Sequence, residues 1–83
     1  MKILYFAWLR ERLNRDEQEL TPPPEVTDIS RLMDWMCEND QAIALAFENR
    51  DLIKTALDEE IVAHDTSLKG AKTIAFFPPM TGG

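Results

Sequence analysis

Cysteine and histidine are scarce in this chain of 83 residues, which has one of each, Cys37 and His64. One thiol excludes an internal disulfide, and the two residues are too few for a protein metal site, so we expect no metal here. The lack of disulfides fits a reducing compartment. Free cysteines are mostly buried, so we expect Cys37 to be a structural thiol under a helix. His64 is expected at the surface or at a sheet edge.

Basic residues and long apolar runs are also few. Lysine and arginine number 9 against 15 aspartates and glutamates, a net charge of −6. This balance disfavours nucleic acid as a partner, because phosphate backbones bind basic surfaces, and it favours a partner with a basic docking face. No run is long enough for a signal peptide or a membrane span. We therefore expect a soluble, cytoplasmic protein with no membrane partner.

The short length allows one small domain with little room for a deep active site. The hydrophobic fraction of 45% is that of a globular protein and excludes general disorder. A chain of this size can still be a substrate, a carrier or a binding module. We therefore expect no catalytic side chains here.

Residues 3–8 predict a strand that is apolar on both faces. Ile3, Tyr5 and Ala7 form one alternating set, and Leu4, Phe6 and Trp8 form the other. Such a strand is either covered on both sides or presents one face to a partner. A helical turn over residues 9–13 and a polar strand over residues 17–21, pairing back on the first, are expected next.

A single amphipathic helix follows the triple proline at residues 22–24, which we interpret as a rigid connector. Thr27 is the expected N-cap. The apolar stripe has helical spacing and comprises Ile29, Leu32, Met33, Met36 and Cys37. Trp35 falls outside this stripe and is expected to be partly exposed.

The second half predicts a short helix over residues 41–49, with Ala42, Leu45 and Ala46 on one side. Two strands, over residues 52–57 and 61–64, should flank a tight acidic turn. A last strand covers residues 73–77. The element order predicts an α+β fold with a mixed sheet and one main helix packed across it. This is the order of a β-grasp (ubiquitin-like) domain, in which the first and last strands lie parallel and adjacent.

The chain ends in a segment suited to presenting a carboxylate. Pro78 and Pro79 direct the segment away from the sheet, and Gly82 and Gly83 lack the Cβ that would block a narrow tunnel. The terminal carboxylate is ionised at neutral pH and must be activated before it accepts a nucleophile, most simply as an acyl-adenylate made with ATP. We therefore expect a β-grasp domain over residues 1–77 and a flexible tail over residues 78–83.

This ending, Phe76-Phe-Pro-Pro-Met-Thr-Gly-Gly83, resembles the small, sulfur-carrier subunits of molybdopterin synthase, a MoaD/ThiS-like family. The start, Ile3-Leu-Tyr-Phe-Ala-Trp-Leu-Arg-Glu11, is similar to that family's opening strand and Leu-Arg-Glu turn. The resemblance covers essentially the whole chain. Asp58, where the family commonly has asparagine, and residues 69–72, where it usually has acids around the glycine, depart from the pattern.

The resemblance implies a role for each part of the tail. An adenylating enzyme, related to ubiquitin-activating enzymes and binding the ATP, would activate Gly83, and a sulfur donor would convert it to a thiocarboxylate. The tail would then enter the active site of the large synthase subunit and give its sulfur to a cyclic pyranopterin precursor. The residues that thread this site would be Pro78, Pro79, Met80, Thr81 and Gly82. No cofactor is expected on this chain.

The resemblance also implies a docking patch of Phe6, Ile61 and Phe77 on the outer sheet face. The alternation agrees, because Phe6 and Phe77 are out of phase with the core positions of their strands. The alternative is that all three are core residues. Three other functions stay open: a thiamine-pathway sulfur carrier, a ubiquitin-like modifier that joins Gly83 to lysines, and a non-catalytic binding module.

Overall fold

The computed structural model describes residues 1–79 as a five-stranded sheet with three α-helices and a 3-10 turn. The strands are β1 (Lys2–Tyr5), β2 (Glu17–Glu19), β3 (Lys54–Leu57), β4 (Glu60–Val62) and β5 (Thr73–Phe77). The helical segments are α1 (Ala7–Leu13), α2 (Ile29–Asn39), α3 (Gln41–Ala46) and the 3-10 turn η1 (Arg50–Leu52). Within residues 1–79, no helix is long and apolar enough to cross a membrane.

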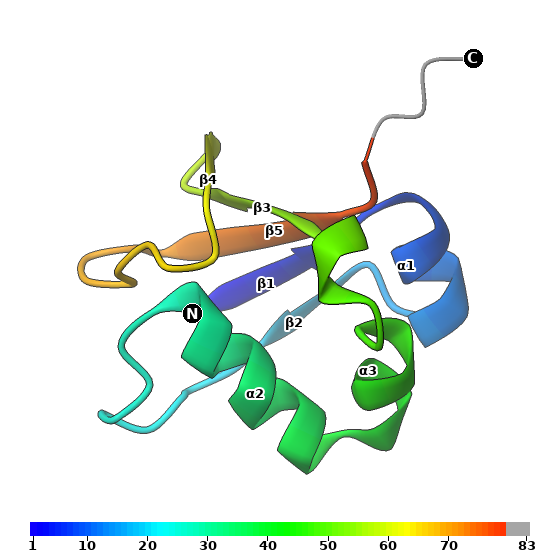
Figure 1. The fold of residues 1–83 in the computed structure, drawn as a ribbon, viewed down its shortest axis with the longest axis horizontal. Helices are drawn as coiled ribbons and strands as arrows, with labels where there is room; N and C mark the ends of the chain where they lie inside the picture. The colour runs from blue at the N-terminus through cyan, green and yellow to red at the C-terminus, as the bar shows by residue number, and fades with distance from the viewer. Residues whose placement is uncertain (80–83) are drawn as a thin grey trace.

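The sheet is mixed and has the order β2-β1-β5-β3-β4, with the parallel pair of β1 and β5 at its centre (Figure 1). The other pairings are antiparallel. The main helix α2 lies across one face of this sheet (Figure 1). The predicted α+β, β-grasp architecture is therefore confirmed.

The core lies between that face of the sheet and the helices. Alternate residues of the two central strands point into it, so that Ile3 and Tyr5 of β1 and Ile74 and Phe76 of β5 are fully or almost fully buried. The predicted stripe of α2 packs against them through Ile29, Leu32, Met33 and Met36, while Cys37 is only partly buried. The candidate functional site lies on the other face of the sheet.

The N-cap of α2 is Asp28, so the prediction of Thr27 was wrong. The Asp28 carboxylate accepts a hydrogen bond from the backbone N–H of Arg31 at 2.8 Å, as an N-cap does. The Thr27 hydroxyl instead accepts a hydrogen bond from the Arg31 guanidinium at 3.0 Å. Two adjacent residues that are both good caps cannot be ranked from sequence alone.

The first strand is shorter than predicted. It ends at Tyr5, and α1 begins at Ala7, whose φ of 53° turns the chain sharply out of the sheet. Trp8 is therefore a helix residue. No glycine or proline marks this break, and a left-handed alanine is uncommon, so the local sequence favoured continuing the strand.

Of the side predicted for the short helix α3, only Ala46 is buried. Ala42 and Leu45 are exposed, and the buried side chains are Ile43, Ala46 and the following Phe47. The phase of α3 is set by Asp40, whose carboxylate caps the helix through the N–H groups of Ala42 and Ile43. The next strand starts two residues later than predicted, because residues 50–52 form the 3-10 turn η1.

The hairpin of β3 and β4 closes through a two-residue turn. Leu57 pairs with Glu60, and the two residues between them, Asp58 and Glu59, have φ values of 46° and 75°. The β4 strand covers Glu60–Val62, where residues 61–64 were expected. The Asp58 carboxylate accepts hydrogen bonds from the backbone N–H groups of Lys72 and Thr73, which anchors the turn to the start of β5.

Candidate functional site

The outer face of the sheet carries a row of apolar side chains. The strand register places Ile61 opposite Ala56, Ala56 opposite Ala75, and Ala75 opposite Leu4. These residues alternate with the core residues of their strands, so they point away from the helices. The row crosses four strands, from the edge strand β4 to the central strand β1.

Two phenylalanines extend this row toward the end of β5. Phe77 pairs with Lys54, and the backbone N–H of Phe6 donates a hydrogen bond to the Phe76 carbonyl oxygen at 3.1 Å. Phe76 is completely buried, whereas Phe77 is half-buried and Phe6 is 45% exposed. We call the whole surface the outer-face patch: Leu4, Phe6, Ala56, Ile61, Ala75 and Phe77. Its exposed side chains are Phe6 and Ile61, whereas Ala56 is buried beneath its neighbours and the other three are partly buried.

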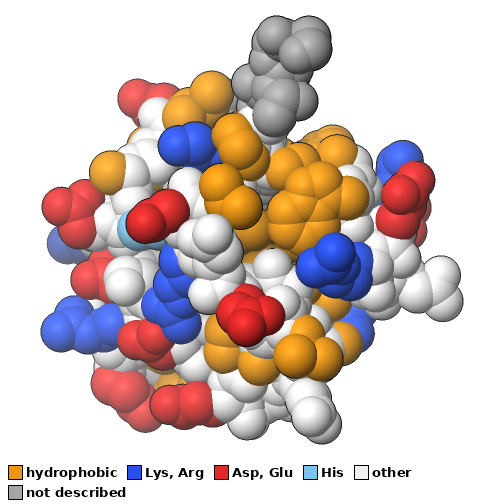
Figure 2. All heavy atoms as spheres, turned by 45° about the vertical axis from the view of Figure 1, so that its right-hand side comes forward, with side chains coloured by type: hydrophobic (Ala, Val, Ile, Leu, Met, Phe, Trp, Pro, Cys, Tyr) orange, Lys and Arg blue, Asp and Glu red, His pale blue; other side chains and the backbone are white. Residues whose placement is uncertain are grey.

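The structure therefore places the three residues of the sequence-predicted docking patch on one face of the sheet. Ile61 is 73% exposed, and with Phe6 and Phe77 it lies outside the buried core. The alternative that all three are core residues is wrong. Figure 2 shows hydrophobic side chains gathered on one face of the molecule, with lysine or arginine side chains beside them. Exposed apolar clusters of this kind mark interaction sites.

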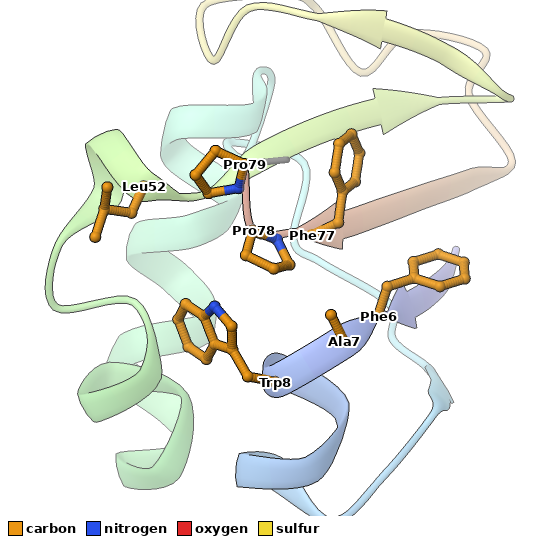
Figure 3. A pocket seen from close by; sticks show the side chains of 7 residues that line it. All are labelled: Phe6, Ala7, Trp8, Leu52, Phe77, Pro78 and Pro79. Atoms are coloured by element: carbon orange, nitrogen blue, oxygen red, sulfur yellow. The ribbon is translucent and has the colours of Figure 1, made fainter. Parts of the chain in front are cut away.

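A hollow of about 770 Å³ adjoins the patch where the chain leaves β5 (Figure 3). Its walls are almost entirely apolar and come from three segments that are distant in sequence. The lining residues are Phe6, Ala7, Trp8, Leu52, Phe77, Pro78 and Pro79. We call this hollow the tail-root groove, because Pro78 and Pro79 form one of its sides.

Sequence reasoning missed Trp8 and Leu52 as groove residues. Both were assigned to strands, and each lies instead in a helical segment that brings it beside the two prolines. The Arg12 guanidinium lies over the Trp8 ring, 4.9 Å from its centroid, in a cation–π contact. The sequence did contain a signal for Trp8: residues 3–8 hold more apolar side chains than one small core can bury.

Of the predicted tail residues, only Pro78 and Pro79 belong to the part of the chain that the structure describes. Pro78 and Pro79 directly follow β5 and are half-buried. Met80, Thr81, Gly82 and Gly83 lie outside the described residues. Their predicted roles therefore stay predictions.

Neither Cys37 nor His64 belongs to this site. Burial raises the pKa of the Cys37 thiol, although the Arg50 guanidinium partly offsets the effect. A raised pKa lowers the thiolate fraction, so Cys37 is a poor nucleophile at neutral pH. The His64 Nε2 atom lies 2.8 Å from the Ile53 carbonyl oxygen, a contact that joins two loop segments. In residues 1–79, no cluster of three or more Cys, His, Asp or Glu residues could hold a metal ion.

Fold and site together define a class of protein: a ubiquitin-like β-grasp domain with one uncovered apolar sheet face beside the exit of its last strand. Comparison with known sequences gives the family. The chain belongs to the ThiS family, whose sequence profile matches residues 3–83.

Two relatives match the full length of the chain. It is 32% identical over 83 residues to the molybdopterin synthase sulfur carrier subunit of Escherichia coli and 29% identical to that of Haemophilus influenzae. Each match covers 100% of this chain and 99% of the relative. The family expected from the two ends of the sequence is therefore confirmed.

Solved structures agree on the fold. A protein described as a molybdopterin converting factor subunit 1 from Pyrococcus furiosus superposes with a TM-score of 0.72 over 95% of each chain, at 24% identity. SAMP1 from Haloferax volcanii superposes with a TM-score of 0.73, over 99% of this chain and 97% of its own, at 20% identity. These likenesses support the β-grasp architecture.

Proposed function

We propose that this chain is a sulfur carrier in molybdopterin synthesis and that Gly83 is the residue that bears the sulfur. The observation that carries the proposal is the extent of the match to relatives named as molybdopterin synthase sulfur carrier subunits. The family profile also runs from the first strand through Gly82 and Gly83. The chain therefore shares with this family both the domain and the segment that would carry sulfur.

The chemistry follows from the properties of a carboxylate. Attack of the Gly83 carboxylate on the α-phosphate of ATP would form an acyl-adenylate and release pyrophosphate. A sulfur donor would then displace AMP and leave a thiocarboxylate. The thiocarboxylate sulfur would attack a carbon of a cyclic pyranopterin precursor and form a thioester link, and water would then cleave the acyl carbon–sulfur bond, which leaves the sulfur on the precursor and restores the Gly83 carboxylate. ATP would be bound by the adenylating enzyme, so this chain needs no cofactor of its own.

Two partners would receive the tail in turn, the adenylating enzyme and the large synthase subunit. The outer-face patch is the surface that we assign to docking, because it is apolar, uncovered and next to Pro78. The dithiolene of molybdopterin contains two sulfur atoms. Carriers must therefore exchange during synthesis, or the complex must hold two copies of each subunit. A cytoplasmic location fits these soluble partners.

Intact-mass measurement tests the function directly. After incubation with the adenylating enzyme, ATP and a sulfur source, we expect a mass increase equal to the replacement of one oxygen by sulfur, localised to Gly83. The matched control is the chain with Gly83 deleted, which should stay folded by circular dichroism and gain no sulfur. An isopeptide adduct on a lysine, or cofactor synthesis by the deleted chain, would contradict the proposal.

A further inference from the structure

The tail-root groove extends beyond the outer-face patch, onto the side of the molecule formed by α1 and η1. Its far wall is made by Trp8 and Leu52 (Figure 3). Leu52 is 46% exposed, and Trp8 is half-buried, packs against the core and lines the groove. A partly buried tryptophan that lines an open apolar hollow is typical of a binding anchor, since tryptophan is enriched among the residues that dominate interface energies.

The position of the groove limits what can cover it. If Gly83 enters the active site of a partner, as the proposed function requires, only residues 80–83 reach from Pro79 into that active site. Fully extended, they span at most about 14 Å. A protein that receives Gly83 must therefore approach within about 14 Å of Pro79, next to the groove that Pro79 lines.

We propose that the large synthase subunit places an apolar projection in the tail-root groove, between Trp8, Leu52 and Pro79. This inference rests on the proposed function and deepens it, because it adds a second anchor to the outer-face patch. Arg12 lies over the Trp8 ring, lines the neighbouring hollow that shares Trp8 and Leu52 with the groove, and forms no ion pair within residues 1–79. The projection is therefore expected to carry an acidic side chain next to its apolar tip.

The large subunit fits the groove better than the other candidates. A subunit that remains in a synthase complex needs about 800 Å² of contact on each partner, and the groove adds apolar contact surface beside the outer-face patch. An adenylating enzyme has to release the carrier after each activation and can use the smaller patch. A second copy of this chain would carry the same net charge of −6 and would block access to Pro79.

Calorimetric titration with the purified large subunit tests the assignment through two variants. Leu52→Glu puts a charge into the groove at an exposed position, and Trp8→Ala removes the aromatic wall. Each is expected to weaken binding, that is, to raise the dissociation constant at least about tenfold. The matched control is Trp35→Ala. Trp35 is also half-buried and packed on the core, but it lies on α2 and lines a different hollow, beside Pro23. That variant should bind within about twofold of the wild type.

Each result either supports or overturns the assignment. Thermal unfolding checks that every variant is folded, and the exposed Leu52→Glu decides the outcome if Trp8→Ala does not fold. Unchanged large-subunit binding by folded Leu52→Glu would overturn the inference, as would a loss seen only in adenylation. Self-association in wild type that Leu52→Glu abolishes, with large-subunit binding unchanged, would assign the groove to a second copy instead. Failure of the wild type itself to gain sulfur would be a failure of the proposed function.

Discussion

At the scale of single residues, one polar network joins the sheet to the helices. The Tyr5 hydroxyl donates a hydrogen bond to the Gln18 side-chain oxygen at 2.6 Å, and Arg15 donates to the same oxygen at 2.9 Å. Arg15 also donates to the Asp40 carboxylate at 2.8 Å, and Asp40 caps α3. Burial raises the pKa of Tyr5, so its neutral hydroxyl is maintained well into the alkaline range.

Asp40 gives this network a predictable dependence on pH. The hydrogen bond from Arg15 and those from the α3 backbone hold the pKa of Asp40 below its ordinary value of 3.8. A carboxyl whose pKa is lowered by folding stabilises the protein above its unfolded pKa, and this contribution is lost as the pH falls through the folded value. We expect Asp40→Asn to show a smaller loss of unfolding free energy than wild type between about pH 4 and pH 2.

Urea unfolding across that pH range checks the prediction. At pH 7, Asp40→Asn should cost about 1 kcal/mol, because asparagine still caps α3 but no longer pairs with Arg15. Asp40→Ala loses the cap as well and should cost about 2 kcal/mol. Parallel pH profiles for wild type and Asp40→Asn would refute the assignment.

At the scale of elements, the turn of the β3–β4 hairpin has a sequence that fits its backbone conformation poorly. Both central residues of its turn, Asp58 and Glu59, have positive φ, a conformation that favours Asn-Gly or Asp-Gly. The backbone strain at Asp58 is offset by the hydrogen bonds that its carboxylate accepts from the backbone N–H groups of Lys72 and Thr73. No described side-chain hydrogen bond or ion pair compensates Glu59 in this way.

Glu59→Gly should therefore stabilise the protein by about 0.5–1 kcal/mol, because glycine adopts positive φ without strain. The measurement is the midpoint of urea unfolding. The control is Glu60→Gly, one residue later in β4, where glycine weakens a strand and should lower stability. A loss of stability in both variants would show that the turn is not strained at residue 59.

At the scale of the whole molecule, the main helix α2 and the outer-face patch lie on opposite faces of one sheet (Figure 1). The helices bury the face that carries Ile3, Tyr5, Ile74 and Phe76, which leaves the outer-face patch uncovered. Stability and docking are thus assigned to different side chains. A surface substitution can alter binding without unfolding the domain.

Phe77→Glu tests this separation. A carboxylate in the middle of the outer-face patch should weaken binding to the large subunit at least about tenfold, because it would be buried without a partner. The thermal midpoint should change little, since Phe77 is half-buried outside the core. Ala42→Glu, at an exposed position of α3, adds the same charge away from the patch and should leave the affinity unchanged. Equal binding by wild type and Phe77→Glu would remove Phe77 from the docking surface.

The sequence by itself determined the features that depend on local pattern. The stripe from Ile29 to Met36 predicted α2, the alternation around Ile74 and Phe76 predicted β5, and the two ends of the chain indicated the family. These predictions agree with the structure because the periodicity of a helix or strand decides which of its residues face the core.

Only the tertiary structure decided the features that depend on contacts between distant segments. The left-handed turn at Ala7 ends β1, the cap by Asp40 sets which face of α3 is buried, and η1 brings Leu52 beside Pro79. No glycine or proline marks the turn at Ala7, and although Asp40 is a favoured N-cap residue, its carboxylate is also held by Arg15, 25 residues away. The tail-root groove is formed by three such segments, so it appears only when the chain is folded.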